Sequence, residues 1–402
     1  MLRRLRDAAG LVLLLLGAAG ATGGDSVTEF LGRHWRRPLA PQGDAPARFS
    51  PLEASLHPEA CGTCHPTQLA DWRTSLHAAS MGPGVAGQIV EMLATDPASA
   101  LGCLGCHAPL AEQAPLAGRI DALADNPGHD RALGGKGVVC AACHVREHER
   151  FGPPRRDGSL TARAPRDTLP HAGVTRTPAF LASGFCRSCH QFQPDGLALN
   201  GKLLQDTYDE WQASRFARSN VHCQDCHMPD RRHLWRGIHD RDMVRGGVSI
   251  TPRVRMERPG PARLVNVSLT LRNTRVGHAF PTYIPPRVVM RVELRDAAGV
   301  PVPGGSEEYT IGRDVSLDMA RELSDTRVQP GQTATVHLRR QVDRRGSSVR
   351  ATVTVYPDAF YTRFFETLLE QGAGRGEPLI RRALEATRRS SFTIYEQEWP
   401  VR

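Results

Sequence analysis

This chain of 402 residues has very few lysines, no long apolar run beyond residue 18 and no cysteine outside one repeated motif. The apolar run at residues 8–18 is too short to cross a bilayer, which takes about 20 apolar residues in a helix, and no later stretch is long enough. Lys136 and Lys202 are the only lysines, so arginine carries nearly all of the positive charge. The lack of a later apolar run excludes a transmembrane helix after the first segment. The lack of lysine leaves arginine as the main cation, and its planar guanidinium group suits pairing with carboxylates.

The N-terminal segment predicts export. Arg3, Arg4 and Arg6 precede the apolar run, and the small residues at 19–21 fit a signal-peptidase site. No cysteine lies near that point, which argues against a lipid anchor. We therefore expect residues 1–21 to be a signal peptide and the mature protein to be exported, to the periplasm or the cell surface.

All 10 cysteines belong to five copies of one pentapeptide, Cys-x-x-Cys-His. A zinc ribbon uses two Cys-x-x-Cys pairs per metal, so five pairs would leave one pair without a partner. A zinc ribbon also does not explain why histidine follows every pair. A disulfide framework would not fix the spacing of the cysteines. The copies are Cys61, Cys64 and His65; Cys103, Cys106 and His107; Cys140, Cys143 and His144; Cys186, Cys189 and His190; and Cys223, Cys226 and His227.

Each pentapeptide is a c-type haem attachment signature. The two thiols bind the two vinyl groups of one porphyrin, and the histidine that follows is the proximal ligand of the iron. The sequence therefore predicts five covalently bound haems, with iron as the metal. Five haems would also explain the formal charge of +9, because their negatively charged propionates offset most of it. A nucleic-acid partner is not predicted, although a basic protein would ordinarily raise that question.

Composition divides the chain into segments. Residues 22–51 are rich in Pro, Gly and Arg and predict an extended arm or linker, most of it on the surface. Residues 52–243 hold the five motifs about 40 residues apart, too little protein for an apolar core around each haem. We expect a haem domain with little regular structure, built of loops and of short helices over residues 67–79, 87–94 and 203–217.

Residues 244–402 predict a second domain without cysteine. Alternation with a period of two predicts antiparallel strands that form a β-sandwich. The fold class is therefore α+β, with helices over residues 358–368 and 378–387 near the C-terminus. The strands are expected over residues 265–271, 288–294, 336–338, 351–355 and 391–395.

Eleven further histidines are candidates for the opposite face of each iron. A second histidine gives a low-spin haem suited to electron transfer, whereas an open face allows a substrate to bind. His77, His171, His239 and His278 are the preferred candidates, and His148 and His222 could serve only a neighbouring haem. His57, His129 and His233 are left open, and His337 is expected in solvent.

Several stretches beside the motifs have a recognisable form: Trp72-x-x-Ser75-x-His77, Gly137-Val-Val-Cys140, Phe185-Cys186 to His190-Gln191, Cys223 to His227-Met228-Pro229, and Gly277-His278-x-x-Pro281-Thr282. Together they resemble multihaem c-type cytochromes related to the tetrahaem nitrifier cytochrome that accepts electrons from hydroxylamine oxidoreductase. This chain has five motifs rather than four and an added β-domain. The resemblance implies respiratory electron transfer, with other cytochromes or a membrane quinol-linked complex as redox partners.

Three functions compete at this point. The favoured one is an electron carrier with no catalytic residue, its haems forming a chain between redox partners. The second is an oxidoreductase acting on a small nitrogen or sulfur compound at one open-faced haem. Pentahaem nitrite reductases resemble the chain in haem count but typically have lysine as the last motif residue, and no Cys-x-x-Cys-Lys occurs here. The third is a docking or structural subunit of a cytochrome assembly.

Overall fold

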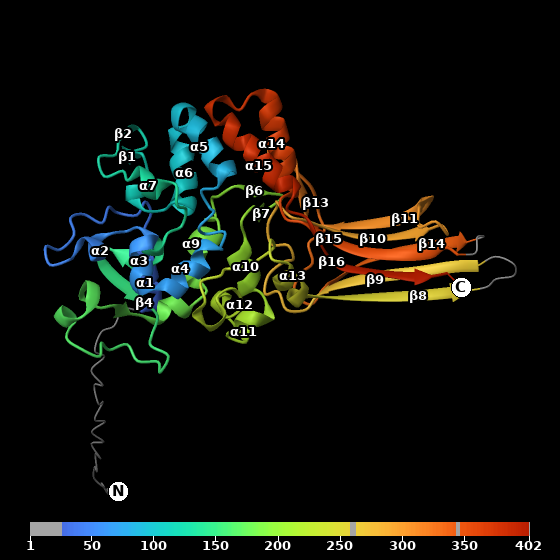
Figure 1. Cartoon of the computed structure of the whole chain (residues 1–402), viewed down its shortest axis with the longest axis horizontal. Coiled ribbons are helices and arrows are strands. Elements are labelled where there is room, and N and C mark those ends of the chain that lie inside the picture. The colour runs from blue at the N-terminus through green and yellow to red at the C-terminus, as the bar shows by residue number, and fades with distance from the viewer. Residues whose placement is uncertain (1–25, 258–262, 343–345, 402) are drawn as a thin grey trace, which may run out of the picture.

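The computed structural model describes residues 26–257, 263–342 and 346–401. It contains helices and antiparallel sheets, which confirms the α+β fold class. In Figure 1 the blue-to-green helices and loops gather at one end, and long yellow-to-red strands project from the other. No helix within the described ranges is both long and apolar enough to cross a membrane. The predicted signal peptide lies outside them.

Each of the five pentapeptides lies on or at the end of a short helix. An i, i+3 spacing places the two cysteines on one face of a helix, so both thiols point toward the same space. Proline at the start of α3 and α6 suits the first helical turn, where its missing N–H is not needed. The helices are α3 (Pro58–Cys64), α6 (Pro97–His107), α8 (Cys140–His144), α9 (Gly184–His190) and α12 (Cys223–His227).

The segment predicted as an extended surface arm is wrong in its described part. Helix α1 (Val27–His34) begins with a capping box in which Ser26 and Glu29 bond each other's backbone N–H. Its Phe30 is buried, and Trp35 and Leu39 beyond it belong to the core of the haem domain. The Pro- and Arg-rich composition of the segment obscured the amphipathic pattern of α1, whose apolar side chains form part of the core of the haem domain.

The rest of the haem domain has the little regular structure that was predicted. The expected helix at 67–79 ends at Arg73, and the one at 203–217 breaks at Ala213–Ser214. The remaining elements are α2 (Pro51–Ala54), α4 (Pro66–Arg73), α5 (Pro83–Thr95), α7 (Arg131–Gly134), α10 (Thr207–Gln212), α11 (Arg215–Arg218) and α13 (Arg241–Gly247), with short strands β1 (Leu116–Arg119), β2 (Ala122–Asp125), β3 (Val145–Arg146), β4 (Glu149–Gly152), β5 (Thr175–Arg176), β6 (Ala198–Leu199) and β7 (Lys202–Leu203).

The second half forms a sandwich of two main antiparallel sheets, in the orders β14-β9-β8 and β11-β10-β15-β16. The alternation predicted for residues 265–271 holds, because every second residue there is fully buried between the sheets. Strands β8 and β11 were not predicted, since prolines and glycines interrupt their pattern. The strands are β8 (Val248–Glu257), β9 (Arg263–Asn273), β10 (Arg287–Arg295), β11 (Pro301–Ile311), β14 (Thr333–Val342), β15 (Ser348–Tyr356) and β16 (Phe392–Pro400), with β12 (Arg313–Val315) and β13 (Glu322–Asp325) beside them.

Helices α14 (Ala359–Gln371) and α15 (Glu377–Arg388) return to the haem domain, where they lie against α5 (Figure 1). Glycines allow the close approach: a Cβ at Gly376 would lie 2.0 Å from the carbonyl oxygen of Gly87. A Cβ at Gly87 itself would meet the side chain of Ile380 at 2.8 Å. The C-terminal helices therefore hold the two halves of the molecule together.

A buried ionic network joins the halves at a second place. Arg327 contacts Glu210 of α10 at 2.7 Å and Asp325 of β13 at 2.9 Å. Lys202 of β7 contacts Asp325 at 2.5 Å, and Arg313 donates to the carbonyl oxygen of Leu203 at 2.6 Å. Because the charges are paired and bonded to backbone carbonyls, the desolvation cost of burying them is offset.

Candidate haem-binding site

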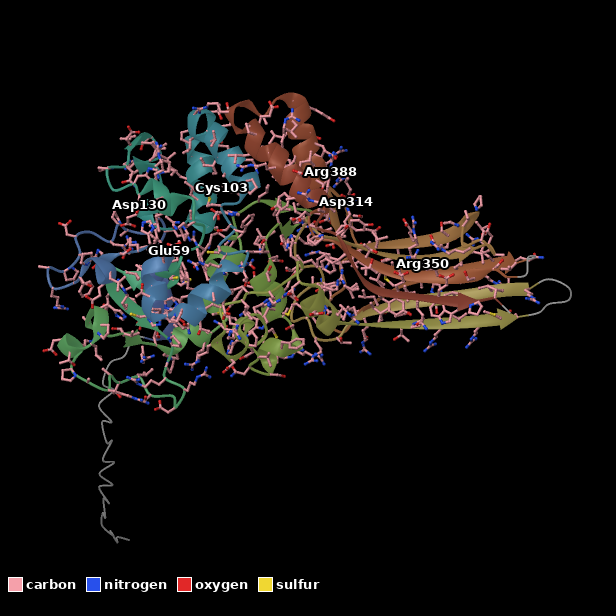
Figure 2. The ribbon with its side chains drawn as sticks, in the orientation of Figure 1. Glu59, Cys103, Asp130, Asp314, Arg350 and Arg388 are labelled. Carbon is pink, nitrogen blue, oxygen red and sulfur yellow. The ribbon has the colours of Figure 1, made fainter. Side chains whose placement is uncertain are left out.

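All ten cysteines and all five histidines of the motifs line one continuous cavity of about 2830 Å³. The cavity runs through the haem domain and reaches α14, α15 and the loop between β9 and β10. Figure 2 shows how densely side chains crowd this half of the molecule, with Cys103 on its upper side. The protein therefore surrounds a shared space rather than five separate pockets, as the small amount of chain per motif predicts.

The motifs touch each other in a definite order. Cysteines of different motifs lie within hydrogen-bonding reach, so the edges that carry a covalent group meet. The third motif also adjoins the fourth, because Cys143 and Phe185, the residue before Cys186, pack against the same core cluster. The hydrogen-bonding pairs are Cys61 with Cys140, Cys106 with Cys189, and Cys186 with Cys223.

The motif histidines are prepared to bind a metal. The Nδ1 atoms of His107 and His144 each lie 2.8 Å from a carbonyl oxygen, and that of His227 lies 2.6 Å from one. A carbonyl only accepts, so Nδ1 carries the proton and Nε2 keeps its lone pair. Metal-binding histidines are usually fixed in this way.

Three histidines stand opposite motif histidines at a distance that suits a shared metal. A metal lies about 2 Å from an imidazole nitrogen, so two imidazoles on one metal have ring centres about 6 Å apart. The rings of His227 and His278 are 6.3 Å apart and within 11° of parallel. The other two pairs are His77 with His190 and His144 with His233, each 6.2 Å apart.

The opposing histidines are kept neutral, with Nε2 free. The Nδ1 atoms of His171, His233 and His278 lie 3.0, 3.1 and 2.9 Å from carbonyl oxygens. Burial lowers the pKa of His278 to about 4 and, with the nearby His190, lowers the pKa of His77 to about 3. A neutral imidazole is the form that binds iron.

Of the predicted distal candidates, His77, His171, His239 and His278 line the cavity. His171 lines the same cavity as His65, in the loop whose backbone N–H bonds Glu53. His239 differs, since its Nε2 is 3.0 Å from the Asp358 carboxylate. His65 and His107 have no opposing histidine ring of the kind described above within the described residues.

The two remaining predicted candidates, of which His222 lines the cavity, have ring nitrogens that bond other parts of the protein. His148 lies in a two-residue turn with positive φ between β3 and β4, which points its ring away from the cavity, and its Nε2 lies 3.0 Å from the Gly43 carbonyl. His222 has both ring nitrogens engaged, with the hydroxyl of Ser183 at 3.2 Å and the side chain of Asn220 at 3.1 Å. The exposed His337 lies on β14 as expected.

His233 is the residue that sequence reasoning did not select. Its signal was weak: it follows two arginines, six residues after the last motif histidine. The fold places it because Asp71 accepts hydrogen bonds from the Arg232 side chain, at 2.6 and 2.7 Å, and from the backbone N–H of His233, at 3.0 Å. That clamp joins α4 to residues 232–233 and aims the ring at His144.

A buried cationic group lies where the second and fourth motifs meet. Arg37 has its guanidinium 2.9 Å from the Cys189 sulfur and 3.7 Å from the Cys106 sulfur. Arg37 and Arg146 lie 5.9 and 5.2 Å from the ring centre of Trp35. Trp35, Arg37 and Arg146 each have a buried N–H group without a partner among the described residues. The space beside them therefore suits a bound group that brings hydrogen-bond acceptors or electron density.

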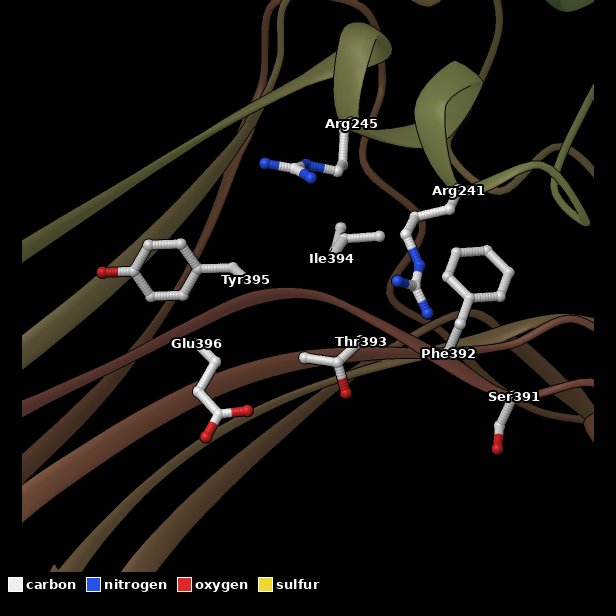
Figure 3. A pocket seen from close by; sticks show the side chains of 8 residues that line it. All are labelled: Arg241, Arg245, Ser391, Phe392, Thr393, Ile394, Tyr395 and Glu396. Atoms are coloured by element: carbon white, nitrogen blue, oxygen red, sulfur yellow. The ribbon is translucent and has the colours of Figure 1, made fainter.

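A second cleft, of about 570 Å³, lies apart from the motifs, between α13 and β16. In Figure 3 Arg241 and Arg245 reach over the strand, and Arg241 lies 5.8 Å from the ring centre of Phe392. It is shallow and no motif residue lines it. The donor set, the opposing rings and the single cavity fit covalently bound haem, whereas this cleft does not.

Comparison with known proteins agrees with this chemistry. Residues 60–145 match the family described as cytochrome c554 and c-prime. The matched segment holds the first three motifs, so this resemblance and the chemistry of the site point to the same class, the multihaem c-type cytochromes.

The fold is that of a crystal structure of a penta-heme cytochrome c552 from Thermochromatium tepidum, with a TM-score of 0.60 and 20% identity over 88% of this chain and 100% of that chain. A protein named ApaA from Bordetella pertussis aligns with 27% of this chain and 76% of its own, at 18% identity, but its TM-score of 0.16 carries no structural argument. No curated protein matches the sequence.

Proposed function

We propose that the protein is an exported electron carrier with five covalently bound c-type haems, acting in a respiratory redox chain in the periplasm or at the cell surface. The observation that carries this proposal is the set of three opposing histidine pairs, at 6.2 to 6.3 Å, within one cavity lined by all five motifs. Haem iron supplies reversible one-electron chemistry, and two histidine ligands favour transfer over substrate binding.

The proposed ligand sets follow from these pairs. His77 serves the fourth motif, His233 the third and His278 the fifth, while His171, which lines the same cavity as His65, is proposed for the first motif. For His171, His233 and His278, the carbonyl oxygens behind the Nδ1 atoms hold the rings in place and keep Nε2 as the binding atom.

The proposed path follows the contacts between motifs. The first adjoins the third, the third adjoins the fourth, and the fourth adjoins both the second and the fifth. The fourth motif is then a junction. An electron entering at the fifth motif can reach either the second motif or the first.

The alternative, an oxidoreductase with one open haem face, is favoured by one observation. His107 has a fixed Nδ1 but no opposing histidine ring within the described residues. The second motif is therefore where a small nitrogen or sulfur compound would bind.

Electron paramagnetic resonance of the holoprotein, with haem counting by mass, tests both functions. The carrier predicts five haems whose low-spin signals do not change on addition of nitrite, hydroxylamine or carbon monoxide. A high-spin signal that any of these compounds removes would reject the pure carrier and support the oxidoreductase. Fewer than five haems would reject the proposed wiring.

A further inference from the structure

The two outward faces of the sandwich differ in how their arginines are partnered. On the sheet β11-β10-β15-β16, arginines and carboxylates alternate and pair, so that face is electrically balanced. The pairs are Arg287 with Asp314, Arg291 with Glu308, Arg295 with Glu293 and Arg350 with Glu396.

The outward face of the other sheet, β14-β9-β8, has arginines without carboxylates. Arg253 and Arg255 of β8, Arg272 of β9 and Arg339 of β14 are exposed and form no ion pair with a described residue. The strand register places Arg255 and Arg339 on either side of Asn266. In Figure 2, side chains ending in nitrogen project from the outer side of β8.

This charge continues to the fifth motif. Arg215 of α11 donates to the carbonyl oxygen of Thr274 at 2.6 Å, just beyond the end of β9. Arg275 follows directly and lines the cavity that the exposed Cys226 of the fifth motif also lines. Both side chains are exposed and without an ion pair among the described residues. The arginine face is defined as Arg215, Arg253, Arg255, Arg272, Arg275 and Arg339.

Very little on the molecule itself neutralises the arginine face. Glu257 lies on it only at the far end, beside Leu264. Asp225, next to Cys226, is an exposed carboxylate at the inner end of the face. Neighbouring like charges cost stability in a sheet, so the face lowers the stability of the free protein and is relieved by an anionic partner.

We infer that the arginine face docks an acidic electron-transfer protein, which exchanges its electron at the fifth motif. The inference rests on the proposed function and adds the class of partner and the place of contact. A strand of ten residues is about 34 Å long and neighbouring strands lie about 4.8 Å apart, so the flat face suits a small, transient contact. Its charge raises the association rate and orients the partner.

The position of the inner arginines decides between partners. A bilayer or a nucleic acid would also be attracted to all six arginines, but only a redox protein needs its contact to lie beside the fifth motif, where Arg215 and Arg275 are. A redox protein does, because they bring its acidic surface against the exposed Cys226 edge.

The test uses the holoprotein and reduced flavodoxin, an acidic flavoprotein, as the probe. Stopped-flow absorbance follows haem reduction at low and high ionic strength. The variant R272Q/R275Q should react roughly tenfold more slowly at low ionic strength, and the difference should vanish at high ionic strength. The matched control, R291Q/R350Q on the balanced face, should react like the wild type.

A second variant separates docking from local changes at the haem. R253Q/R255Q lies farther from the fifth motif, so it should slow flavodoxin in the same direction, but less, with reduction potentials unchanged. Equal rates for all four proteins overturn the inference. Loss of binding to phosphatidylglycerol vesicles, with flavodoxin rates unchanged, overturns it in favour of a membrane.

Failure of the proposed function gives a different result. A protein that dithionite cannot reduce and air cannot reoxidise is no electron carrier. Reversible reduction by dithionite, together with flavodoxin rates that ignore the substitutions, rejects only the docking face.

Discussion

His278 shows how one residue of the β-domain completes a site in the haem domain. Its ring lies nearly parallel to that of His227, and its Nδ1 is 2.9 Å from the Ala279 carbonyl oxygen. Glu210 of α10 holds the loop that carries His278, because its carboxylate accepts hydrogen bonds from the Ala279 N–H at 3.2 Å and from the Thr282 hydroxyl at 2.6 Å. The ring is therefore fixed before any iron is bound.

Replacing His278 with alanine should change one haem from low spin to high spin. The opposing nitrogen is lost, and the imidazole of His227 remains on the other side. Electron paramagnetic resonance and the visible spectrum measure the change. His337→Ala, which removes an exposed histidine of β14, is the control and should leave both spectra as they are. An unaltered spectrum for H278A would exclude His278 as a ligand.

Arg37 predicts a change in potential rather than in spin. Its charge lies against the sulfurs of Cys106 and Cys189, and a nearby cation favours the reduced, less positive haem. A unit charge roughly 10 Å from an iron, at an effective dielectric constant of about 20, contributes about 2 kcal/mol, on the order of tens of millivolts.

Arg37→Met should therefore lower the reduction potential of the haems at the second and fourth motifs. A spectroelectrochemical titration measures it. Arg36→Met removes the same charge from the exposed neighbouring side chain and should shift the titration much less. Identical titration curves for R37M and the wild type would show that Arg37 only fills space.

At the scale of elements, the contact between α5 and the C-terminal helices depends on glycine. Gly376→Ala should lower the free energy of unfolding by about 1–3 kcal/mol, because its Cβ would meet the Gly87 carbonyl oxygen at 2.0 Å. Thermal unfolding followed by circular dichroism measures the loss. Gly32→Ala in α1 has open space around it and should be neutral or stabilising by about 0.5–1 kcal/mol. Equal melting temperatures for G376A and the wild type would mean that the helices can move apart freely.

Elements whose cause is local were predictable from the sequence. The motif helices and the core strands follow from i, i+3 spacing and from two-residue alternation. The capping box at Ser26 and Glu29 was also visible, although the composition around it obscured it. The pairing of His233 with His144 was not, because it depends on the Asp71 clamp between segments about 160 residues apart.

For the whole molecule, the Arg327 network makes the union of the two halves sensitive to acid. Burial alone would raise the Asp325 pKa, but hydrogen bonds from Arg327 and Lys202 outweigh it and hold that pKa well below its usual range. An unfolded aspartate titrates near pH 3.9, so this stabilisation is complete above about pH 5 and is lost as the pH falls through and below 4.

Asp325→Asn should accordingly lower the melting temperature at pH 7 and weaken its fall between pH 5 and pH 3. Asp121→Asn, in an exposed pair with Arg119, is the control and should change little. Parallel pH profiles for D325N and the wild type would contradict the prediction.

The loop that carries His278 also sets an order for maturation. The fifth motif ends at residue 227, but the ring facing it belongs to a loop between β9 and β10, held in place by a sandwich that closes only when β16 pairs with β15 near the end of the chain. A newly made chain can thus attach haem at the fifth motif before it can fill the opposite side of that iron. In the proposed ligand set, the opposite face of this haem would stay open until the sandwich had folded, so completion of the set would report folding of the β-domain.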